Sequence, residues 1–344
     1  MKKSGCIYAL VAMTVLGCGK DEGGLVPIPA KIGIFMVGHA NKQTAQVAQI
    51  VENGILQDLS SGEKNAYAWG VAVSGADVYV VGNQTNGTAM VAKLWKNGTS
   101  QDLSNGINSA MAKGVTLSGK DVYVTGASHN PEDDNYSATL WKNGIPKNLT
   151  DGSFDANAQN IAIFQNDVYI VGRERNGNGA NVAKFWKNGL VQELSDGTNN
   201  AIAIDIAIDE ANADVYIAGY ERIGGAWLAQ LWKNGEAQPL TDGSQDAWAT
   251  AISFKAEHIY VAGYEENDQG VMVAKLWVNG VGQNLSDGVT PAFAQDVAIL
   301  GNDVYVAGYT TMEVSTDTAV LWKNGEVEYT GPAKSIVTSM VTVE

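Results

Sequence analysis

Leu94-Trp95-Lys96-Asn97-Gly98 decides the fold, because this stretch recurs along the chain. The later copies are residues 140–144, 185–189, 231–235, 276–280 and 321–325, and a weaker first copy is 50–54. Their final glycines stand at positions 54, 98, 144, 189, 235, 280 and 325, so neighbouring copies are 44 to 46 residues apart. A regular period of this size predicts a repeat architecture.

One repeat contains four short strand patterns: strand A at 66–73, strand B at 78–82, strand C at 90–96 and strand D at 99–103. Strand B is rich in β-branched and aromatic residues. Asn97-Gly98 between C and D is a strong signal for a two-residue hairpin turn. Each strand type occurs seven times, which predicts an all-β, seven-bladed β-propeller with four antiparallel strands per blade. A six- or eight-bladed ring fits this count less well.

The two ends of the repeat region complement each other. The region begins on a B strand and ends on an A strand at 335–344, so the first blade lacks the strand that the C-terminus supplies. We therefore expect the C-terminal strand to join the N-terminal blade and close the ring, whereas an open solenoid would leave exposed edges.

The composition of strand A indicates how each blade is oriented. Its small residues, such as Ala66, Ala68 and Gly70, suit the crowded position nearest the axis, which leaves strand D outermost. The B–C loops and D–A connections then share one end of the ring, called the loop face below. The A–B turns and the Asn-Gly turns share the other end, the Asn-Gly face.

The repeat resembles bacterial SBBP-type β-propeller repeats, whose units also run Asp-Val-Tyr-Val-x-Gly and then Ala-Lys-Leu, and it is distantly similar to kelch repeats. The resemblance covers about residues 31–344. The repeat has one glycine where kelch has two, and it lacks the Trp-Asp pair of WD repeats. Its Leu-Ser-Asp-Gly turn differs from the Ser-x-Asp-x-Gly-x-x-Trp box of sialidases. The resemblance implies an architecture and not an activity.

Residues 1–17 resemble a bacterial lipoprotein signal peptide. Two lysines precede an apolar stretch at 7–16, which is shorter than the ~20 residues of a membrane span. The resemblance implies cleavage before Cys18, lipidation of Cys18 and anchoring at the bacterial outer membrane; an ordinary secretory signal is the alternative. An acidic pair shortly afterwards resembles an export signal to the cell surface. Residues 18–30 then form a tether ahead of the propeller at 31–344.

Charge and cysteine content narrow the possible partners. The formal net charge is −15, and cleavage before Cys18 removes two lysines, giving −15 − 2 = −17. This balance argues against nucleic acid and against anionic membrane surfaces, apart from the lipid anchor itself. The only other cysteine, Cys6, leaves with the signal, so the domain must fold without a disulfide. We expect a monomer.

A tryptophan occupies the same place in six copies. The six are Trp95, Trp141, Trp186, Trp232, Trp277 and Trp322. A ring of tryptophans could bind sugars, but we interpret a side chain that recurs in every blade as core packing. The Asp-Gly pairs at 151–152, 196–197, 242–243 and 287–288 fit turns better than a metal cage, because one acid per blade is spread around the ring.

The loop face varies from blade to blade, and variable loops on a rigid scaffold commonly carry binding sites. We expect a loop at 127–137, and three consecutive blades place a tyrosine directly after the glycine of strand B. The candidate ligand-binding residues are Tyr220, Tyr264, Tyr309, Trp227, Trp248, Trp69, Arg173, Glu221 and Glu265. Such an aromatic, acidic face would suit a glycan or a protein, and the alternative is that the tyrosines only cap the blades.

The axial channel is a second candidate site. The strand A position of Gly70 becomes Asn160, Asp205 and Asp296 in later blades. If this position faces the axis, these three side chains could hold a cation such as calcium. We favour the alternative of a water-filled channel with solvated acids. No cofactor is expected, and no motif supports a particular metal.

Catalysis finds little support in the sequence. The three histidines, His39, His129 and His258, belong to no Ser-His-Asp grouping, zinc spacing, phosphate loop or dinucleotide fingerprint. A carboxylate pair drawn from two blades would leave no spacing in the sequence and stays open.

We therefore predict a lipid-anchored cell-envelope propeller that is not an enzyme and binds a glycan or a protein through its loop face. The alternatives are a carbohydrate-active hydrolase or lyase that uses loop-face carboxylates, and a structural component of an envelope complex.

Overall fold

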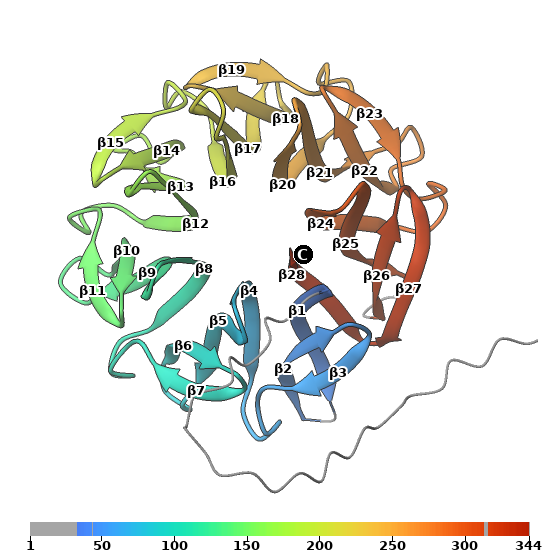
Figure 1. The fold of residues 1–344 in the computed structure, drawn as a ribbon. Helices are drawn as coiled ribbons and strands as arrows, with labels where there is room; N and C mark the ends of the chain where they lie inside the picture. The colour runs from blue at the N-terminus through green and yellow to red at the C-terminus, as the bar shows by residue number, and fades with distance from the viewer. Residues whose placement is uncertain (1–32, 43, 313–315, 344) are drawn as a thin grey trace, which may run out of the picture.

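The computed structural model describes residues 33–42, 44–312 and 316–343, which form a ring of seven four-stranded antiparallel sheets (Figure 1). The predicted seven-bladed β-propeller is confirmed. No helix in this part of the chain is long and apolar enough to cross a membrane. The predictions for the signal peptide, for Cys18 and for the tether fall outside the described residues.

Each blade contains four strands, and their order below runs from the innermost to the outermost. The blades are β28 (Ser335–Val343), β1 (Gly33–Lys42), β2 (Ala45–Glu52) and β3 (Ile55–Asp58); β4 (Ala66–Ser74), β5 (Asp77–Thr85), β6 (Met90–Lys96) and β7 (Thr99–Asp102); β8 (Ala110–Ser118), β9 (Asp121–Asn130), β10 (Asn135–Lys142) and β11 (Ile145–Asn148); β12 (Ala156–Phe164), β13 (Asp167–Arg175), β14 (Asn181–Lys187) and β15 (Leu190–Glu193); β16 (Ala201–Asp209), β17 (Asp214–Ile223), β18 (Ala226–Lys233) and β19 (Glu236–Pro239); β20 (Ala247–Lys255), β21 (His258–Glu266), β22 (Met272–Val278) and β23 (Val281–Asn284); and β24 (Ala292–Leu300), β25 (Asp303–Thr311), β26 (Asp317–Lys323) and β27 (Glu326–Ala333).

The ring closes through its first blade, as expected. The C-terminal β28 pairs antiparallel with β1, with Met36 opposite Met340, and it supplies the innermost strand of that blade. The ring is therefore held shut by backbone hydrogen bonds between segments about 300 residues apart in sequence. This pairing also covers the inner edge of β1, which would otherwise be exposed.

A bulge in each innermost strand explains the glycine that recurs in strand B. In the second blade the register between β4 and β5 shifts between Ala68 and Gly70, which leaves Trp69 as the extra residue. At the bulge, β4 comes so close to β5 that a Cβ atom on Gly82 would clash with the carbonyl oxygen of Tyr67. The same clash recurs in the other blades at Gly38, Gly126, Gly172, Gly219, Gly263 and Gly308.

The recurring tryptophans form the core, as predicted. All six are at most 2% exposed. Trp95 lies in a cluster with residues from the preceding blade, including Phe35 and Ala48, and the indole nitrogen of Trp232 donates to the carbonyl of Leu194 at 3.0 Å. Each tryptophan therefore joins two neighbouring blades, in addition to filling its own.

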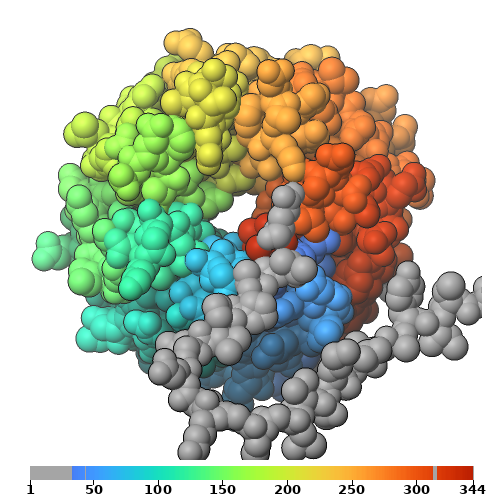
Figure 2. Space-filling view, in the orientation of Figure 1, coloured from blue at the N-terminus to red at the C-terminus, as the bar shows by residue number. Residues whose placement is uncertain are grey.

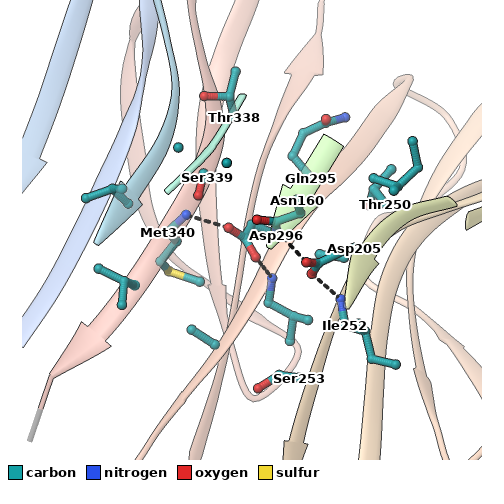
Figure 3. A pocket seen from close by; sticks show the side chains of 18 of the residues that line it. Asn160, Asp205, Thr250, Ile252, Ser253, Gln295, Asp296, Thr338, Ser339 and Met340 are labelled. Atoms are coloured by element: carbon teal, nitrogen blue, oxygen red, sulfur yellow. Dashed lines mark hydrogen bonds between the residues drawn. The ribbon is translucent and has the colours of Figure 1, made fainter. Parts of the chain in front are cut away.

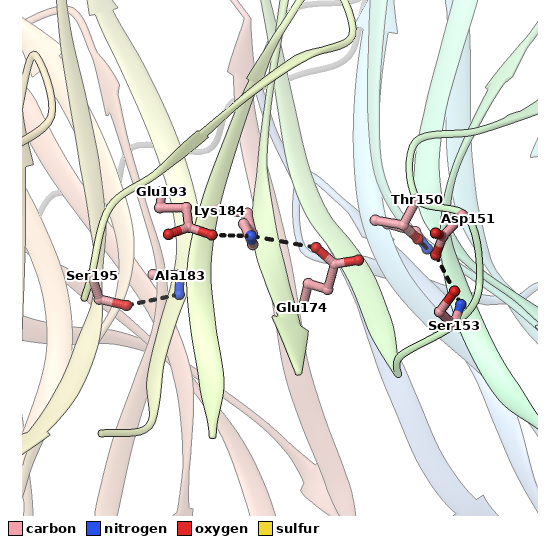
Figure 4. Close-up of polar contacts among 9 residues, drawn as sticks. Thr150, Asp151, Ser153, Glu174, Ala183, Lys184, Glu193 and Ser195 are labelled. Atoms are coloured by element: carbon pink, nitrogen blue, oxygen red, sulfur yellow. Dashed lines mark hydrogen bonds and ion pairs between the residues drawn. The ribbon is translucent and has the colours of Figure 1, made fainter. Parts of the chain in front are cut away.

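The Leu-Ser-Asp-Gly turns are structural (Figure 4). The hydroxyl of Ser195 accepts a hydrogen bond from the Ala183 amide at 3.1 Å and ties the turn to strand C. The carboxylate of Asp151 accepts from the Ser153 amide at 2.9 Å, which closes the turn between blades. These acids bind their own turns and are spread around the ring, in agreement with the turn interpretation.

The expected loop at 127–137 is mostly strand. Strand β9 continues to Asn130 and β10 begins at Asn135, so only four residues separate them. The expectation was wrong because Gly126 does not end the strand: Ala127 and the residues after it keep pairing with strand C, Ala127 opposite Ala138. Strand B continues past its glycine in the other blades too, so the loop face is built largely from strand ends.

Candidate site at the channel mouth

The innermost strands enclose a cavity of about 590 Å³ along the axis of the ring. The space-filling view shows the opening at the centre of the blades (Figure 2). Trp69, Lys113, Tyr220 and Tyr264 border the cavity near the loop face, and Ile299 and Thr342 border it toward the opposite end. The channel mouth at the loop face therefore carries the aromatic and cationic side chains.

Aromatic rings form an arc over the sixth and seventh blades on the loop face. The ring centroids of Trp248 and Tyr264 are 5.2 Å apart, those of Tyr264 and Phe293 are 5.0 Å apart, and those of Phe293 and Tyr309 are 4.9 Å apart. In the fifth blade, Tyr220 meets the edge of Trp227 at 5.3 Å. Rings at these separations support one another, so each is fixed in place.

The arc explains the ionisation of its tyrosines. Burial raises the pKa of Tyr220, and it raises the pKa of Tyr264 further, with smaller contributions from Tyr220 and Tyr309. Burial, followed by the negative charge of Asp317, raises the pKa of Tyr309. The three phenols stay protonated at neutral pH and can donate hydrogen bonds to a ligand.

A second aromatic group stands across the channel in the first two blades. Tyr67 and Trp69 are stacked with centroids 5.9 Å apart, and the ring of His39 meets both edge-on at 4.8 and 5.5 Å. The indole nitrogen of Trp69 donates to Asn83 Oδ1 at 2.6 Å. Lys113 Nζ lies over the indole ring of Trp69, 3.7 Å from the ring centroid, close enough for a cation–π contact.

Burial changes the ionisation of both basic groups at this point. It lowers the pKa of Lys113 from 10.5 to about 8. It also lowers the pKa of His39 from 6.5 to about 4; the positive charge of Lys113 adds to this effect, and Asp317 opposes it. His39 is therefore neutral at neutral pH, and its buried Nδ1 has no hydrogen-bond partner among the residues that the structure describes.

The channel acids differ from the solvated acids that we favoured (Figure 3). Asp205 is 9% exposed; it accepts hydrogen bonds from Asn160 at 2.5 Å and from the amide of Ile252, in the next blade, at 2.8 Å. Asp296 accepts from the amides of Val297 at 2.7 Å and Met340 at 2.6 Å. Both carboxylates thus join neighbouring blades across the inner wall.

Desolvation dominates the ionisation of this pair. Burial raises the pKa of Asp205 to about 6 against the effect of its amide donors, and burial together with the charge of Asp205 raises the pKa of Asp296 to about 7. Within the described residues, no group of three or more His, Cys, Asp or Glu side chains could hold a metal ion. A calcium site at these acids therefore stays without support from the geometry.

The charged loop-face candidates are engaged with protein groups. Arg173 donates to Asn181 at 2.7 Å and to Asp155 at 3.1 Å. Glu265 pairs with Lys275. Burial, and then the charge of Asp196, raises the pKa of Glu221. These residues come from the fourth, fifth and sixth blades and are not among those that line the cavity.

Sequence reasoning missed four members of the site: His39, Tyr67, Lys113 and Phe293. A signal for them exists in the repeat. His39 occupies the position after the strand B glycine that Tyr220 holds in the fifth blade, and Lys113 occupies the bulge position of Trp69. Aligning all seven blades position by position, instead of three, would have found both.

The surroundings of the histidines can be compared with the arrangement that acyl transfer uses. His129 Nε2 lies 2.9 Å from Asp134 Oδ1, but Asp134 is 96% exposed on its side chain, and no hydroxyl nucleophile contacts this histidine. Within the described part of the chain, no histidine joins a carboxylate and a serine in the arrangement that acyl transfer uses.

No protein-family model matches this chain, and no curated protein matches it. Solved structures do. A puromycin-hydrolysing peptidase from Mycobacterium tuberculosis aligns with 88% of this chain and 55% of its own length at 10% identity and a TM-score of 0.55. The acylaminoacyl peptidase of Pyrococcus horikoshii aligns with 87% of this chain and 51% of its own at 13% identity and a TM-score of 0.53.

The β-propeller domain of the Trilobed protease from Pyrococcus furiosus aligns over 88% of this chain and 92% of its own length, at 10% identity and a TM-score of 0.53. That domain has an open velcro topology, whereas β28 and β1 close the ring in this chain. The chain spans about half the length of the two peptidases, and at these identities the likeness shows a shared fold.

These comparisons overturn the leading functional prediction. We expected a non-catalytic module that binds a glycan or a protein, but the solved structures that share the ring are described as peptidases. A non-catalytic binding role therefore has no support, and the expectation that the protein is not an enzyme stays unconfirmed. The prediction was wrong because the repeated residues determine the packing of the blades, and a fold of this kind does not determine function.

Proposed function

We propose that this propeller takes part in amide-bond hydrolysis, and that the mouth of its channel takes up a small aromatic acyl-amide substrate. The observation that carries the proposal is the aromatic lining of the mouth, where Trp69, Tyr220 and Tyr264 border a cavity of about 590 Å³. A volume of this order suits a small organic ligand. The shared fold with amide-cleaving peptidases supports the class of reaction.

The proposal assigns uptake and orientation of the substrate to the ring. Hydrolysis through a covalent intermediate needs a nucleophile beside a base. The hydroxyls of Thr250 and Thr338, which also line the cavity, donate to backbone carbonyls instead. An aromatic acyl group would pack against the arc of Trp248, Tyr264 and Phe293. The phenol of Tyr220 would donate to its carbonyl oxygen. Holding the amide in one orientation lowers the entropic cost of the later step.

Binding of a matched pair of amides tests the recognition step. We expect N-acetyl-L-tyrosinamide to bind at least about tenfold more tightly than N-acetyl-L-alaninamide, because only the former buries an aromatic ring. Tyr264→Ala should remove the preference, and Tyr329→Ala, on outermost strand β27 away from the channel, should keep it. Equal affinity of the full-length protein for the two amides would count against the proposal.

The reaction itself is tested in cells. We expect envelope extracts from a strain that lacks this protein to release p-nitroaniline from N-acetyl-L-tyrosine p-nitroanilide more slowly than extracts from the parent strain. Restoring the wild-type chain should restore the rate, and restoring the Tyr264→Ala chain should not. An unchanged rate in the deletion strain would argue against a part in amide hydrolysis.

Anchoring at the bacterial outer membrane through a lipid on Cys18 is a separate proposal, supported by the resemblance of residues 1–17 to a lipoprotein signal. Replacing Cys18 with Ala should move the protein from the membrane fraction to the soluble fraction. Retention of the variant on the membrane would contradict it. A monomeric state is likewise proposed, and light scattering of the purified protein tests it.

A further inference from the structure

Lys113 is a partly buried cation for which no ion pair forms in the described part of the chain. Other lysines of the ring form ion pairs, as Lys184 does with Glu193 at 2.7 Å and Glu174 at 3.4 Å (Figure 4). The Lys113 ammonium lies over the indole of Trp69, 3.7 Å from the ring centroid, and desolvation lowers its pKa. A desolvated ammonium without a counter-charge is costly, in a chain whose net charge is −15.

The side chains around Lys113 hold it in place without neutralising it. Trp69 is fixed by its hydrogen bond to Asn83 at 2.6 Å and by stacking on Tyr67. His39 is neutral at neutral pH, so it adds no second positive charge, and the effect of Lys113 on its pKa is larger than that of Asp317. The ammonium faces the cavity, which Lys113 helps to line.

We propose that Lys113 is the anchor for the carboxylate of a small organic acid that enters the channel mouth, with Trp69 as its supporting platform and Tyr220 and Tyr264 across the cavity as contacts for the rest of the molecule. This inference rests on the proposed uptake of aromatic acyl-amides and narrows the ligand to N-acylamino acids that end in a free carboxylate.

The chemistry of the site favours a carboxylate. A single ammonium neutralises one negative charge, and charge-assisted hydrogen bonds to a carboxylate are stronger than neutral ones. The low local polarity around Trp69 strengthens this attraction relative to water. Tyr220 and Tyr264 retain their phenolic protons, so they suit the carbonyl of an acyl group.

The test compares N-acetyl-L-tyrosine with its neutral counterpart N-acetyl-L-tyrosinamide by calorimetry on the full-length protein. We expect the acid to bind at least about tenfold more tightly than the amide. Lys113→Met should abolish that difference, and Lys113→Arg should keep most of it. Lys120→Met is the matched control, because Lys120 is an exposed lysine in the same blade, and it should leave the difference unchanged.

Folding of the variant is checked by thermal unfolding. Removing a partly buried charge that forms no ion pair should leave the melting temperature of Lys113→Met unchanged or higher. Equal affinity of the wild type for acid and amide overturns the inference and leaves the aromatic uptake intact. A preference for the acid that survives in Lys113→Met also overturns it. If neither compound binds, both the proposed uptake and the role of Lys113 are overturned. If only the acid binds, the role of Lys113 is supported and the proposed uptake of neutral acyl-amides is overturned.

Discussion

The two faces of the ring use the repeat in opposite ways. On the Asn-Gly face, five blades build the same contact: the strand C lysine pairs with the aspartate before strand B at 2.6 to 2.9 Å and lies over a tyrosine ring, as Lys187 does with Asp167 and Tyr169. On the loop face, the position after the strand B glycine holds five residue types in seven blades: His39, Asn83, Ala127, Arg173, and then Tyr220, Tyr264 and Tyr309.

The difference separates residues that build blades from residues available to a ligand. A position with the same buried surroundings in each blade keeps the same residue type, as the six buried tryptophans show. The loop-face position lies opposite a small strand C alanine in every blade, for example Tyr264 opposite Ala274, so its own side chain can vary without disturbing the sheet. Variation is thus permitted at the channel mouth and restricted at the opposite face.

The largest effect should come from a tryptophan of the uniform set. Trp186→Ala should lower the free energy of unfolding by ~3–5 kcal/mol, because Trp186 is 1% exposed and its loss leaves a cavity between blades. Trp227→Ala on the loop face is the control, since Trp227 is half-buried and should cost clearly less. If urea unfolding showed the same decrease in the free energy of unfolding for both variants, the distinction between the two faces would be contradicted.

Acids on the inner wall and acids on the Asn-Gly face should respond to pH in opposite directions. Asp296 has a folded pKa of about 7, above its ordinary 3.8. The folded protein therefore holds a proton that the unfolded chain releases, and the stability that this group contributes is lost as pH rises from about 4 through about 7. The asparagine and lysine partners of Asp167 lower its pKa, so its contribution is lost as pH falls below its ordinary pKa.

Urea unfolding of wild type and Asp296→Asn across this range measures the first effect. The wild type should lose on the order of 4 kcal/mol relative to the variant between about pH 4 and pH 8. Taking the difference removes the contribution of His39, whose lowered pKa acts in the opposite direction. A difference that is flat with pH, or that has the opposite slope, would show that the amide hydrogen bonds outweigh desolvation at Asp296.

The smallest effect concerns the blade from β20 to β23, one of two described blades in which both members of the Asn-Gly-face pair are replaced; the other is the first blade, with Gly33 and Glu52 at these positions. His258 stands in place of the aspartate and Val278 in place of the lysine, although Asn279 still accepts from the amide of Ile259 at 2.9 Å. Restoring the pair with His258→Asp and Val278→Lys should raise the free energy of unfolding by only ~0.2–1 kcal/mol. A larger gain in thermal or urea unfolding would mean that the uniform contact stabilises blades more than an exposed ion pair can.

The sequence by itself determined the number of blades, the order of strands A to D, the turns and the closure of the ring by the C-terminal strand. These features depend on local signals such as Asn97-Gly98, and on a period that repeats them seven times. The burial of the six tryptophans followed for the same reason. The length of the turn between β9 and β10 could not be predicted in this way. Strands B and C continue to pair past Gly126, where Ala127 lies opposite Ala138, so the glycine does not mark the end of the strand.

Only the tertiary structure decided what meets at the axis. Lys113 reaches Trp69 from the next blade, Asp205 binds the amide of Ile252, and Asp296 binds that of Met340. Each partner is about one full repeat away in the chain, so no local spacing marks the contact. Closing the ring brings all the innermost strands to one channel and removes water from their side chains. The fold, and not the neighbouring residues in the sequence, therefore decides whether a lysine at the channel forms an ion pair and whether an acid at the channel is solvated.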